Sequence, residues 1–215
     1  TYKNLEIIII YDDKEKKDLK FIEGFINLDK RISLIINEKS LGAGLSRNIG
    51  ISKSKGKYIS FIDADDIWRK DKLELQIKFM REKNYLISHT NYEIIDKENN
   101  ILSLRIARDF NTVNDLLRSC DIGLSSVILR KEILSEECLF ENLKTKEDFV
   151  LWLRILKKNI KIGALQKNLM YWRKLNNSLS SSVIQKIKDG YYVYNKFMKF
   201  NLLKSLFFLF LLSVN

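Results

Sequence analysis

The stretch that decides the fold is Lys57-Tyr58-Ile59-Ser60-Phe61-Ile62-Asp63-Ala64-Asp65-Asp66-Ile67-Trp68. Its first half, residues 58–62, is rich in β-branched and aromatic residues, which is typical of a buried strand. The strand then ends in three carboxylates within four positions. Because ligands of an open α/β sheet bind at the carboxyl ends of its strands, we expect this acidic end at the functional edge.

The crowded carboxylates predict a divalent cation at this edge. Carboxylates that lie close together raise one another's pKa unless a cation lies between them. Their oxygen atoms suit Mg²⁺ or Mn²⁺, which one or two carboxylates and the phosphates of a substrate commonly hold. The alternative is a solvated turn in which Asp66 caps the helix that follows.

Composition narrows the class of protein. The chain has 215 residues and a hydrophobic content of 46%, which fits one large domain or one domain with an appendage. Its net charge of +11 suits nucleic acid, an anionic membrane surface, or polyanionic substrates such as nucleotide diphosphates. The lysines are scattered and no nucleic-acid motif is visible, so a membrane surface is favoured over nucleic acid. Cys120 and Cys138 have no metal or redox spacing, which predicts reduced thiols.

Strands and helices alternate on both sides of the acidic stretch. Residues 5–11 are almost continuously apolar, as in a strand buried on both faces of a parallel sheet, and they too end in carboxylates, Asp12 and Asp13. Further strands are expected at residues 32–36, 85–95, 126–129 and 160–172. Helices are expected at residues 14–27, 41–54 (after a glycine-containing loop), 71–83, 111–119, 147–158 and 180–200, with a surface excursion at 96–110. This alternation predicts an α/β fold with a mostly parallel sheet between helices, in three α/β/α layers.

The C-terminal end differs from the rest of the chain. Residues 202–212 are almost entirely apolar but too few to span a bilayer, which takes roughly 20 residues. With the flanking lysines at 186, 188, 196, 199 and 204, the run fits an interfacial amphipathic segment that meets lipid. A helix that covers the sheet and the start of a longer span are the alternatives. We therefore expect a catalytic domain at 1–180 and a helical, hydrophobic tail at 181–215, in a cytoplasmic protein peripheral to the inner face of the membrane.

A third pair of acids, Glu147 and Asp148, opens the predicted helix at 147–158. Negative charge is stable there because of the helix dipole, so an ordinary first-turn role is the alternative to a functional one. Together the three acidic groups could read a nucleotide, hold a metal and act as a base. A nucleotidyltransferase, which also uses paired acids and a metal, remains open as a rival class. So does a non-catalytic, membrane-associated binding module.

Four segments give the chain a resemblance to a known family. They are Ile-Ile-Ile-Ile-Tyr-Asp-Asp (7–13), Gly-Ala-Gly-Leu-Ser-Arg-Asn-Ile-Gly-Ile (42–51), the block at 55–68, and Lys-Glu-Asp-Phe-Val-Leu-Trp-Leu-Arg (146–154). In this order and spacing they resemble the family 2 glycosyltransferases with the GT-A fold, over about residues 2 to 180. The resemblance implies an inverting, metal-dependent transfer of sugar from a nucleotide-diphosphate sugar to a hydroxyl acceptor. That acceptor would belong to a lipid-linked or cell-surface glycan precursor.

The resemblance also implies roles for single residues. Asp148 matches the catalytic base, with Glu147 as its usual neighbour. The residues that match nucleotide contacts are Asp12 and Asp13 at the base, Arg47 and Asn48 along the nucleotide site, and Asp63 near the ribose. Asp63 and Asp65 match the Asp-x-Asp motif at the metal-bound diphosphate, with Asp66 adjacent as a further metal candidate. Arg173, Ser178 and Ser180 resemble a late segment that closes over the diphosphate.

Two departures from the family pattern bear on the donor site. Members of the family normally begin with another strand and helix before the position of Thr1, so the resemblance implies that the first βα unit of the nucleotide site is missing. After Asp12 and Asp13, the usual Gly-Ser is replaced by Lys14-Glu15, which alters the turn beside the nucleotide base. These departures predict weak donor binding by the chain as it stands.

Overall fold

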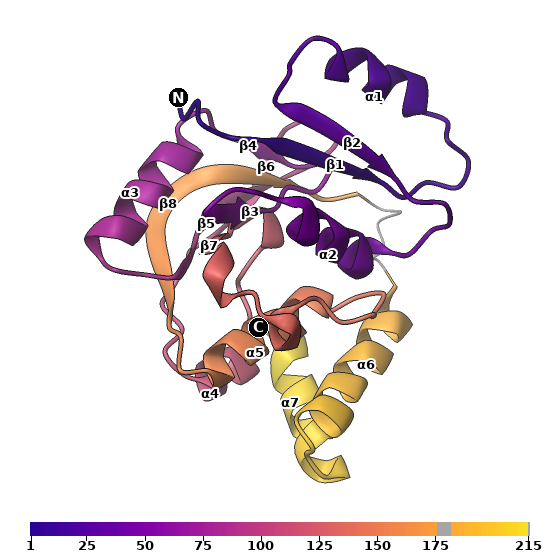
Figure 1. Ribbon diagram of the computed structural model, residues 1–215. Helices are drawn as coiled ribbons and strands as arrows, with labels where there is room; N and C mark the ends of the chain where they lie inside the picture. The colour runs from indigo at the N-terminus through magenta and orange to yellow at the C-terminus, as the bar shows by residue number, and fades with distance from the viewer. Residues whose placement is uncertain (176–181, 215) are drawn as a thin grey trace.

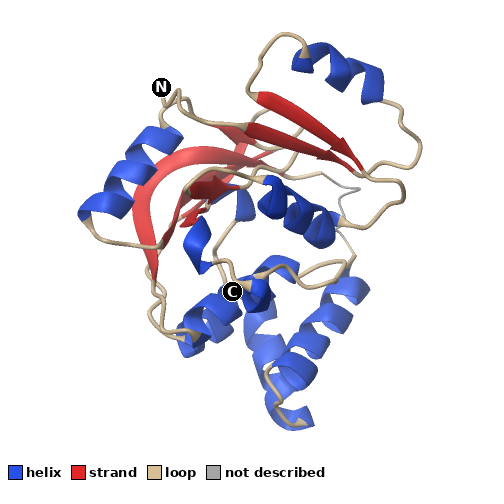
Figure 2. Cartoon of the chain, in the orientation of Figure 1, coloured by secondary structure: helices blue, strands red, loops and turns tan. Residues whose placement is uncertain are grey.

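The computed structural model describes residues 1–175 and 182–214 and shows a mixed α/β fold with a curled sheet (Figure 1, Figure 2). Strand β1 (Ile7–Tyr11) pairs in parallel with β2 (Ile32–Ile36), and α1 (Leu19–Ile26) connects them. A second sheet has the order β3-β7-β5-β8-β4, with β6 paired to β5. Its strands are β3 (Tyr58–Ser60), β4 (Ile67–Trp68), β5 (Ile87–Ile95), β6 (Ile101–Arg105), β7 (Ile128–Arg130) and β8 (Ile162–Arg173).

The expected α/β class is confirmed, but the expected direction of the strands needs correction. Only β1–β2 and β5–β8 pair in parallel in the described chain; β3–β7, β4–β8, β5–β6 and β5–β7 are antiparallel. For β5–β6 the physical reason is the length of the connection, because a parallel crossover needs a dozen or more residues. The short turn after β5 can only form a hairpin, so β6 lies in the segment predicted as a surface excursion.

Two helices in the first half of the chain agree closely with the sequence pattern, whereas α1 begins five residues after its predicted start at residue 14. Helix α2 (Ala43–Lys53) and α3 (Lys72–Glu82) each begin and end within two residues of the predicted bounds. Helix α4 (Val113–Arg118) starts with a capping box in which Thr112 and Asp115 satisfy each other's backbone N–H groups. Helix α5 (Glu147–Lys157) lies in the core and is more deeply buried than an amphipathic helix, since Phe149 to Leu153 are all at most 2% exposed.

The C-terminal region is two helices rather than the one predicted. Helix α6 (Val183–Tyr192) continues into a π-helical turn, the chain reverses, and α7 (Leu202–Val214) packs back alongside it (Figure 1). Gly190 permits this close approach, because a Cβ atom there would lie 2.8 Å from a methyl group of Leu209. No helix within residues 1–175 and 182–214 is long and apolar enough to cross a membrane.

Candidate active site

The acidic loop between β3 and β4 is held together by one serine. Asp66 is buried, and its carboxylate accepts hydrogen bonds from the Ser125 hydroxyl (2.5 Å) and the Arg173 backbone N–H (3.0 Å). The same Ser125 Oγ accepts the backbone N–H of Asp63 at 3.0 Å. Burial raises the pKa of Asp66 to about 6, although these hydrogen bonds oppose the shift. Asp66 therefore serves the shape of the loop.

Asp65 differs from its neighbour. It is partly exposed, and its carboxylate forms no hydrogen bond or ion pair with any residue that the structure describes. The Arg173 side chain holds the backbone of this loop instead, with Nε donating to the carbonyl of Asp65 (3.0 Å) and Nη1 donating to that of Asp96 (2.9 Å). The Asp65 carboxylate is thus available to a ligand.

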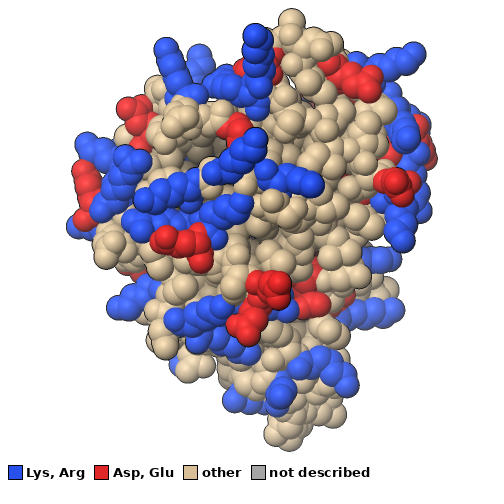
Figure 3. Space-filling model, viewed as in Figure 1, with Lys and Arg blue, Asp and Glu red and all other residues tan. Residues whose placement is uncertain are grey.

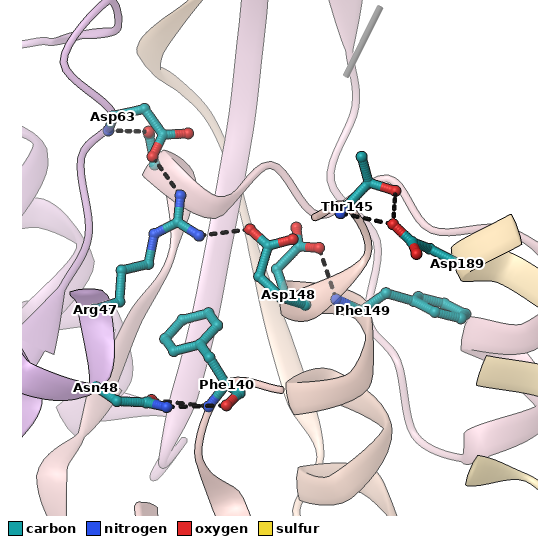
Figure 4. A network of polar contacts seen from close by, with 10 residues as sticks. Arg47, Asn48, Asp63, Phe140, Thr145, Asp148, Phe149 and Asp189 are labelled. Carbon is teal, nitrogen blue, oxygen red and sulfur yellow. Dashed lines mark hydrogen bonds and ion pairs between the residues drawn. The ribbon is translucent and has the colours of Figure 1, made fainter. Parts of the chain in front are cut away.

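Arg47 connects the acidic loop with the start of α5 (Figure 4). From α2, its guanidinium forms ion pairs with Asp63 at 2.7 Å and with Glu147 at 2.6 Å. The Arg47 side chain is only 16% exposed. Burial opposes its charge, but the two carboxylates outweigh burial and raise the pKa of Arg47. Gly44 lets α2 come this close, since a Cβ atom there would lie only 2.7 Å from the carbonyl oxygen of Glu141 and 3.3 Å from the side chain of Glu147.

Glu147 and Asp148 open α5 directly after a strained residue. Lys146 has a left-handed backbone (φ 67°), which costs a side-chain-bearing residue on the order of 1 kcal/mol. Burial raises the pKa of Glu147 to about 6, with Asp148 adding to the shift and Arg47 opposing it. Burial also raises the pKa of Asp148, against the attraction of Lys146 and Arg47. Asp148 accepts one hydrogen bond, from the N–H of Phe149 at 2.7 Å.

The other predicted residues divide into those that serve the fold and those that remain accessible. Asn48 exchanges two hydrogen bonds of 2.9 Å with the backbone of Phe140, whose ring lies 5.5 Å from the Arg47 guanidinium carbon. The Asp12 carboxylate accepts hydrogen bonds from the side chains of Asn37 and Ser40 and from the N–H groups of Leu41 and Gly42, at 2.6–3.1 Å. Asp13, next to it, is exposed.

The structure thus brings Arg47, Asp63, Glu147 and Asp148 into one network and leaves Asp13 outside it. Ser178 and Ser180 lie outside the described residues. Two residues that support the site were not predicted. Ser125 binds the acidic loop, and Asp189 on α6 binds Thr145 beside the network (Figure 4). No group of three His, Cys, Asp or Glu residues in the described part of the chain forms a complete metal site. Nothing in the local sequence marks Ser125 or Asp189, because each binds a residue more than 40 positions away.

The fold and the site together define an α/β protein of the GT-A type. The sequence profile of "Glycosyl transferase family 2" matches residues 1–134, and the chain belongs to this family. An Escherichia coli relative, "UDP-Glc:alpha-D-GlcNAc-diphosphoundecaprenol beta-1,3-glucosyltransferase WfgD", is 34% identical over 201 residues, which cover 93% of this chain and 77% of WfgD.

Other relatives are longer than this chain. An uncharacterized glycosyltransferase of Rickettsia bellii (strain RML369-C) is 37% identical over 171 residues, which cover 79% of this chain but only 24% of that protein. Among solved structures, S. aureus TarS 1–349 in complex with UDP-GlcNAc superposes with a TM-score of 0.68 at 18% identity. The match covers 88% of this chain and 58% of the TarS chain, and at this identity it supports the fold alone.

Proposed function

We propose that the protein is an inverting glycosyltransferase that moves a sugar from a nucleotide-diphosphate sugar to a hydroxyl group of a lipid-linked acceptor. One observation carries the proposal: Arg47 binds Asp63 of the acidic loop and Glu147 of the α5 start at once. A donor held by the loop and an acceptor held at α5 would therefore meet across a single side chain. The activity named for WfgD, transfer of glucose from UDP-Glc to a GlcNAc-diphosphoundecaprenol, supports a UDP-sugar donor and a diphosphoundecaprenol-linked acceptor.

Asp148 is the base in this mechanism. The ion pair with Arg47 occupies Glu147, whereas no ion pair to the Asp148 carboxylate occurs among the described residues. Its raised pKa improves its ability to take a proton from a sugar hydroxyl. That hydroxyl oxygen then attacks the anomeric carbon from the face opposite the leaving nucleotide, which inverts the configuration.

The donor is held by the acidic ends of β1 and β3. Asp13, exposed beside β1, is the contact for the base, and Asp63 with Arg47 lies along the ribose. The donor set of the loop suits Mg²⁺ or Mn²⁺, because Asp65 and the second oxygen of Asp63 supply one or two carboxylates and the diphosphate supplies the rest. Such a cation, when bound, offsets the charge of the leaving diphosphate. The ion pair with Arg47 keeps the carboxylate of Asp63 in one orientation.

The C-terminal helices α6 and α7 form the surface that meets an anionic membrane. One face of α7, with Ser205, Phe208 and Leu209, packs on the core, whereas Leu203 and Phe207 on the other face are 79% and 57% exposed. On the face shown in Figure 3, Lys and Arg side chains lie beside the apolar surface at this end of the molecule. Apolar side chains among cations suit the interface of an anionic bilayer. Co-sedimentation with phosphatidylglycerol vesicles tests this, and binding that survives Phe207→Ser together with Leu203→Ser would contradict it.

The activity is tested in two steps. Calorimetric titration of UDP and GDP, with and without Mn²⁺, should give binding that requires the metal and is lost in Asp65→Ala. Transfer of labelled glucose from UDP-glucose to a diphosphoundecaprenol-linked sugar should then fall by about 10²–10⁴-fold in Asp148→Asn, the usual contribution of a general base. Metal-independent nucleotide binding, or transfer that Asp148→Asn leaves intact, would sink the proposal. Nucleotide binding without any sugar transfer would favour the rival binding module.

A further inference from the structure

A buried contact outside the acidic network joins α6 to the turn that precedes α5 (Figure 4). Asp189 Oδ2 accepts two hydrogen bonds from Thr145, one from its backbone N–H and one from its hydroxyl, both at 2.9 Å. Asp189 and Thr145 are 7% and 8% exposed. The residues are 44 positions apart, so the contact fixes two distant parts of the chain to each other.

The position of Thr145 connects this contact to the start of α5. Only Lys146, with its left-handed backbone, separates Thr145 from Glu147, where α5 begins. A non-glycine residue keeps this conformation only where its surroundings hold it there. With the N–H and hydroxyl of Thr145 bound to Asp189, the chain has little freedom to relax the turn. The direction in which Glu147 and Asp148 leave the turn therefore depends on α6.

Asp189 is itself held in place on α6, and the turn that follows α6 packs on α5. Gln185, one turn earlier on α6, donates from Nε2 to the other carboxylate oxygen of Asp189 at 3.0 Å. One turn later, the ring of Tyr194 packs edge-on against Phe149 of α5 at 6.2 Å and stacks on Phe200 and Phe208. Helix α6 and the π-helical turn that follows it therefore meet the start of α5 through a polar contact and an apolar one, respectively. Both act on the first turn of α5, which carries Asp148.

We propose that Asp189 is a positioning residue, which fixes the Thr145–Lys146 turn and through it the orientation of Asp148 toward the acceptor hydroxyl. The inference rests on the proposed function, because it assigns Asp189 to the base of that reaction. Asp189 touches neither substrate nor reacting atoms. The expected loss is consequently in the rate of the chemical step and not in donor binding.

Asn195 supplies a matched control. It lies on the same C-terminal unit, and its side chain donates to the carbonyl of Phe200 at 3.1 Å, so Asn195→Ala also removes a hydrogen bond from that unit. Unlike Asp189, it has no hydrogen bond with the Thr145–Asp148 segment. A general weakening of α6 and α7 would show in both variants, whereas loss of positioning would show only in Asp189→Ala.

The test compares kcat for sugar transfer, the Kd of UDP with Mn²⁺, and the exchange rate of the Val150 amide, which donates to the carbonyl of Lys146 in the first turn of α5. In Asp189→Ala, kcat should fall by about 10- to 100-fold, the effect of a small misplacement of a reacting group, while the Kd stays the same. Val150 should exchange faster. Asp189→Asn should restore most of kcat, because its side-chain oxygen can still accept both hydrogen bonds from Thr145.

The outcomes separate this inference from the proposed function. Equal losses of kcat in Asp189→Ala and Asn195→Ala, or no loss in either, would overturn the inference and leave the transferase in place. If the unaltered protein transfers no sugar, the proposed function fails, and a Val150 amide that exchanges no faster in Asp189→Ala overturns the inference as well. Should Asp189→Ala not fold, Thr145→Val removes only the hydrogen bond from the Thr145 hydroxyl. An unchanged kcat in Thr145→Val would overturn the inference.

Discussion

The two acidic strand ends of this protein, Asp12-Asp13 after β1 and Asp63 to Asp66 after β3, look alike in sequence and are built in the same way. In each, one carboxylate accepts hydrogen bonds that hold its loop and a neighbour remains accessible, while in the β3 loop Asp63 also pairs with Arg47. Asp12 binds the loop that leads to α2, and Asp66 binds Ser125 and the backbone of Arg173. Asp13 and Asp65 are the accessible partners. Each strand end thus pairs a structural carboxylate with an accessible one.

The two structural carboxylates nevertheless have opposite electrostatics. Burial tends to raise the pKa of Asp12, but hydrogen bonds from Asn37, Leu41 and Gly42 outweigh it and lower the pKa. At Asp66, burial outweighs the hydrogen bonds from Ser125 and Arg173 and raises the pKa to about 6. The difference has two causes: Asp12 has four donors and Asp66 two, and Asp66 is the more deeply buried and lies beside the charges of Asp63 and Asp65. Asp12 therefore stabilises its loop as an anion, whereas ionisation of Asp66 is disfavoured.

Among changes at the two strand ends, the largest expected effect is at Asp65. Asp65→Asn removes the accessible charge of the β3 loop and should reduce sugar transfer by about 10²–10³-fold, as loss of one preorganised electrostatic group does in other enzymes. The free energy of unfolding should change by less than about 0.5 kcal/mol, because the carboxylate has no partner among the described residues. Steady-state transfer rates and urea unfolding measure the two quantities.

Asp66→Ala is the control for that prediction. It leaves the Ser125 hydroxyl and the Arg173 N–H without their acceptor, which should lower the free energy of unfolding by about 1–3 kcal/mol. The distinction between an accessible Asp65 and a structural Asp66 would be wrong if Asp65→Asn destabilised the fold and Asp66→Ala left its stability unchanged.

Much of the fold was predictable because its first half is locally determined. The apolar runs of β1 and β2 and the periodicity of α3 depend on near neighbours, and their bounds agree with the structure. Strand β6 was not predictable, because the polar turn after β5 is compatible with a surface excursion as well as with a hairpin. The break between α6 and α7 was also missed, because the turn carries Lys199 at φ 57° where a glycine would have signalled it.

The site was predictable in its residue types but not in its division of labour. The sequence singled out Arg47, Asp63 and Glu147, and these form one network. It could not separate Asp65 from Asp66, because the difference lies in Ser125, which is 59 residues away from Asp66. Asp189 was missed for the same reason. Partner choice across such distances is a property of the packed core.

The next effect in size is at Asp12. Asp12→Asn substitutes an amide for a carboxylate that accepts four hydrogen bonds, so its NH₂ group faces donors. Unfolding free energy should fall by about 1.5–3 kcal/mol, as for hydrogen bonds to a charged group. Because the pKa of Asp12 is lowered on folding, its contribution is present above the ordinary value of 3.8 and is lost as pH falls through the lower folded value.

Urea unfolding of both proteins at about pH 7 and at about pH 3 measures this dependence, and the difference in unfolding free energy should be smaller at the acidic pH. Ser33→Ala, on the exposed face of β2, is a neutral control because its hydroxyl makes only a long hydrogen bond to Ile7. A difference that grows in acid would mean that Asp12 is not the anion that its donors indicate.

Asp13 gives the smallest effect and the sharpest comparison with Asp65. Its carboxylate accepts an exposed 3.1 Å hydrogen bond from the N–H of Glu15 and only a long one, 3.4 Å, from the hydroxyl of Tyr11, so Asp13→Ala should change the unfolding free energy by less than about 0.5 kcal/mol. If Asp13 contacts the nucleotide base, UDP binding should weaken by about tenfold, the equivalent of one hydrogen bond to a charged group. Since the base takes no part in the chemical step, kcat should remain unchanged, unlike in Asp65→Asn. A fall in kcat with an unchanged Kd for UDP would mean that the two accessible carboxylates act on the same part of the donor.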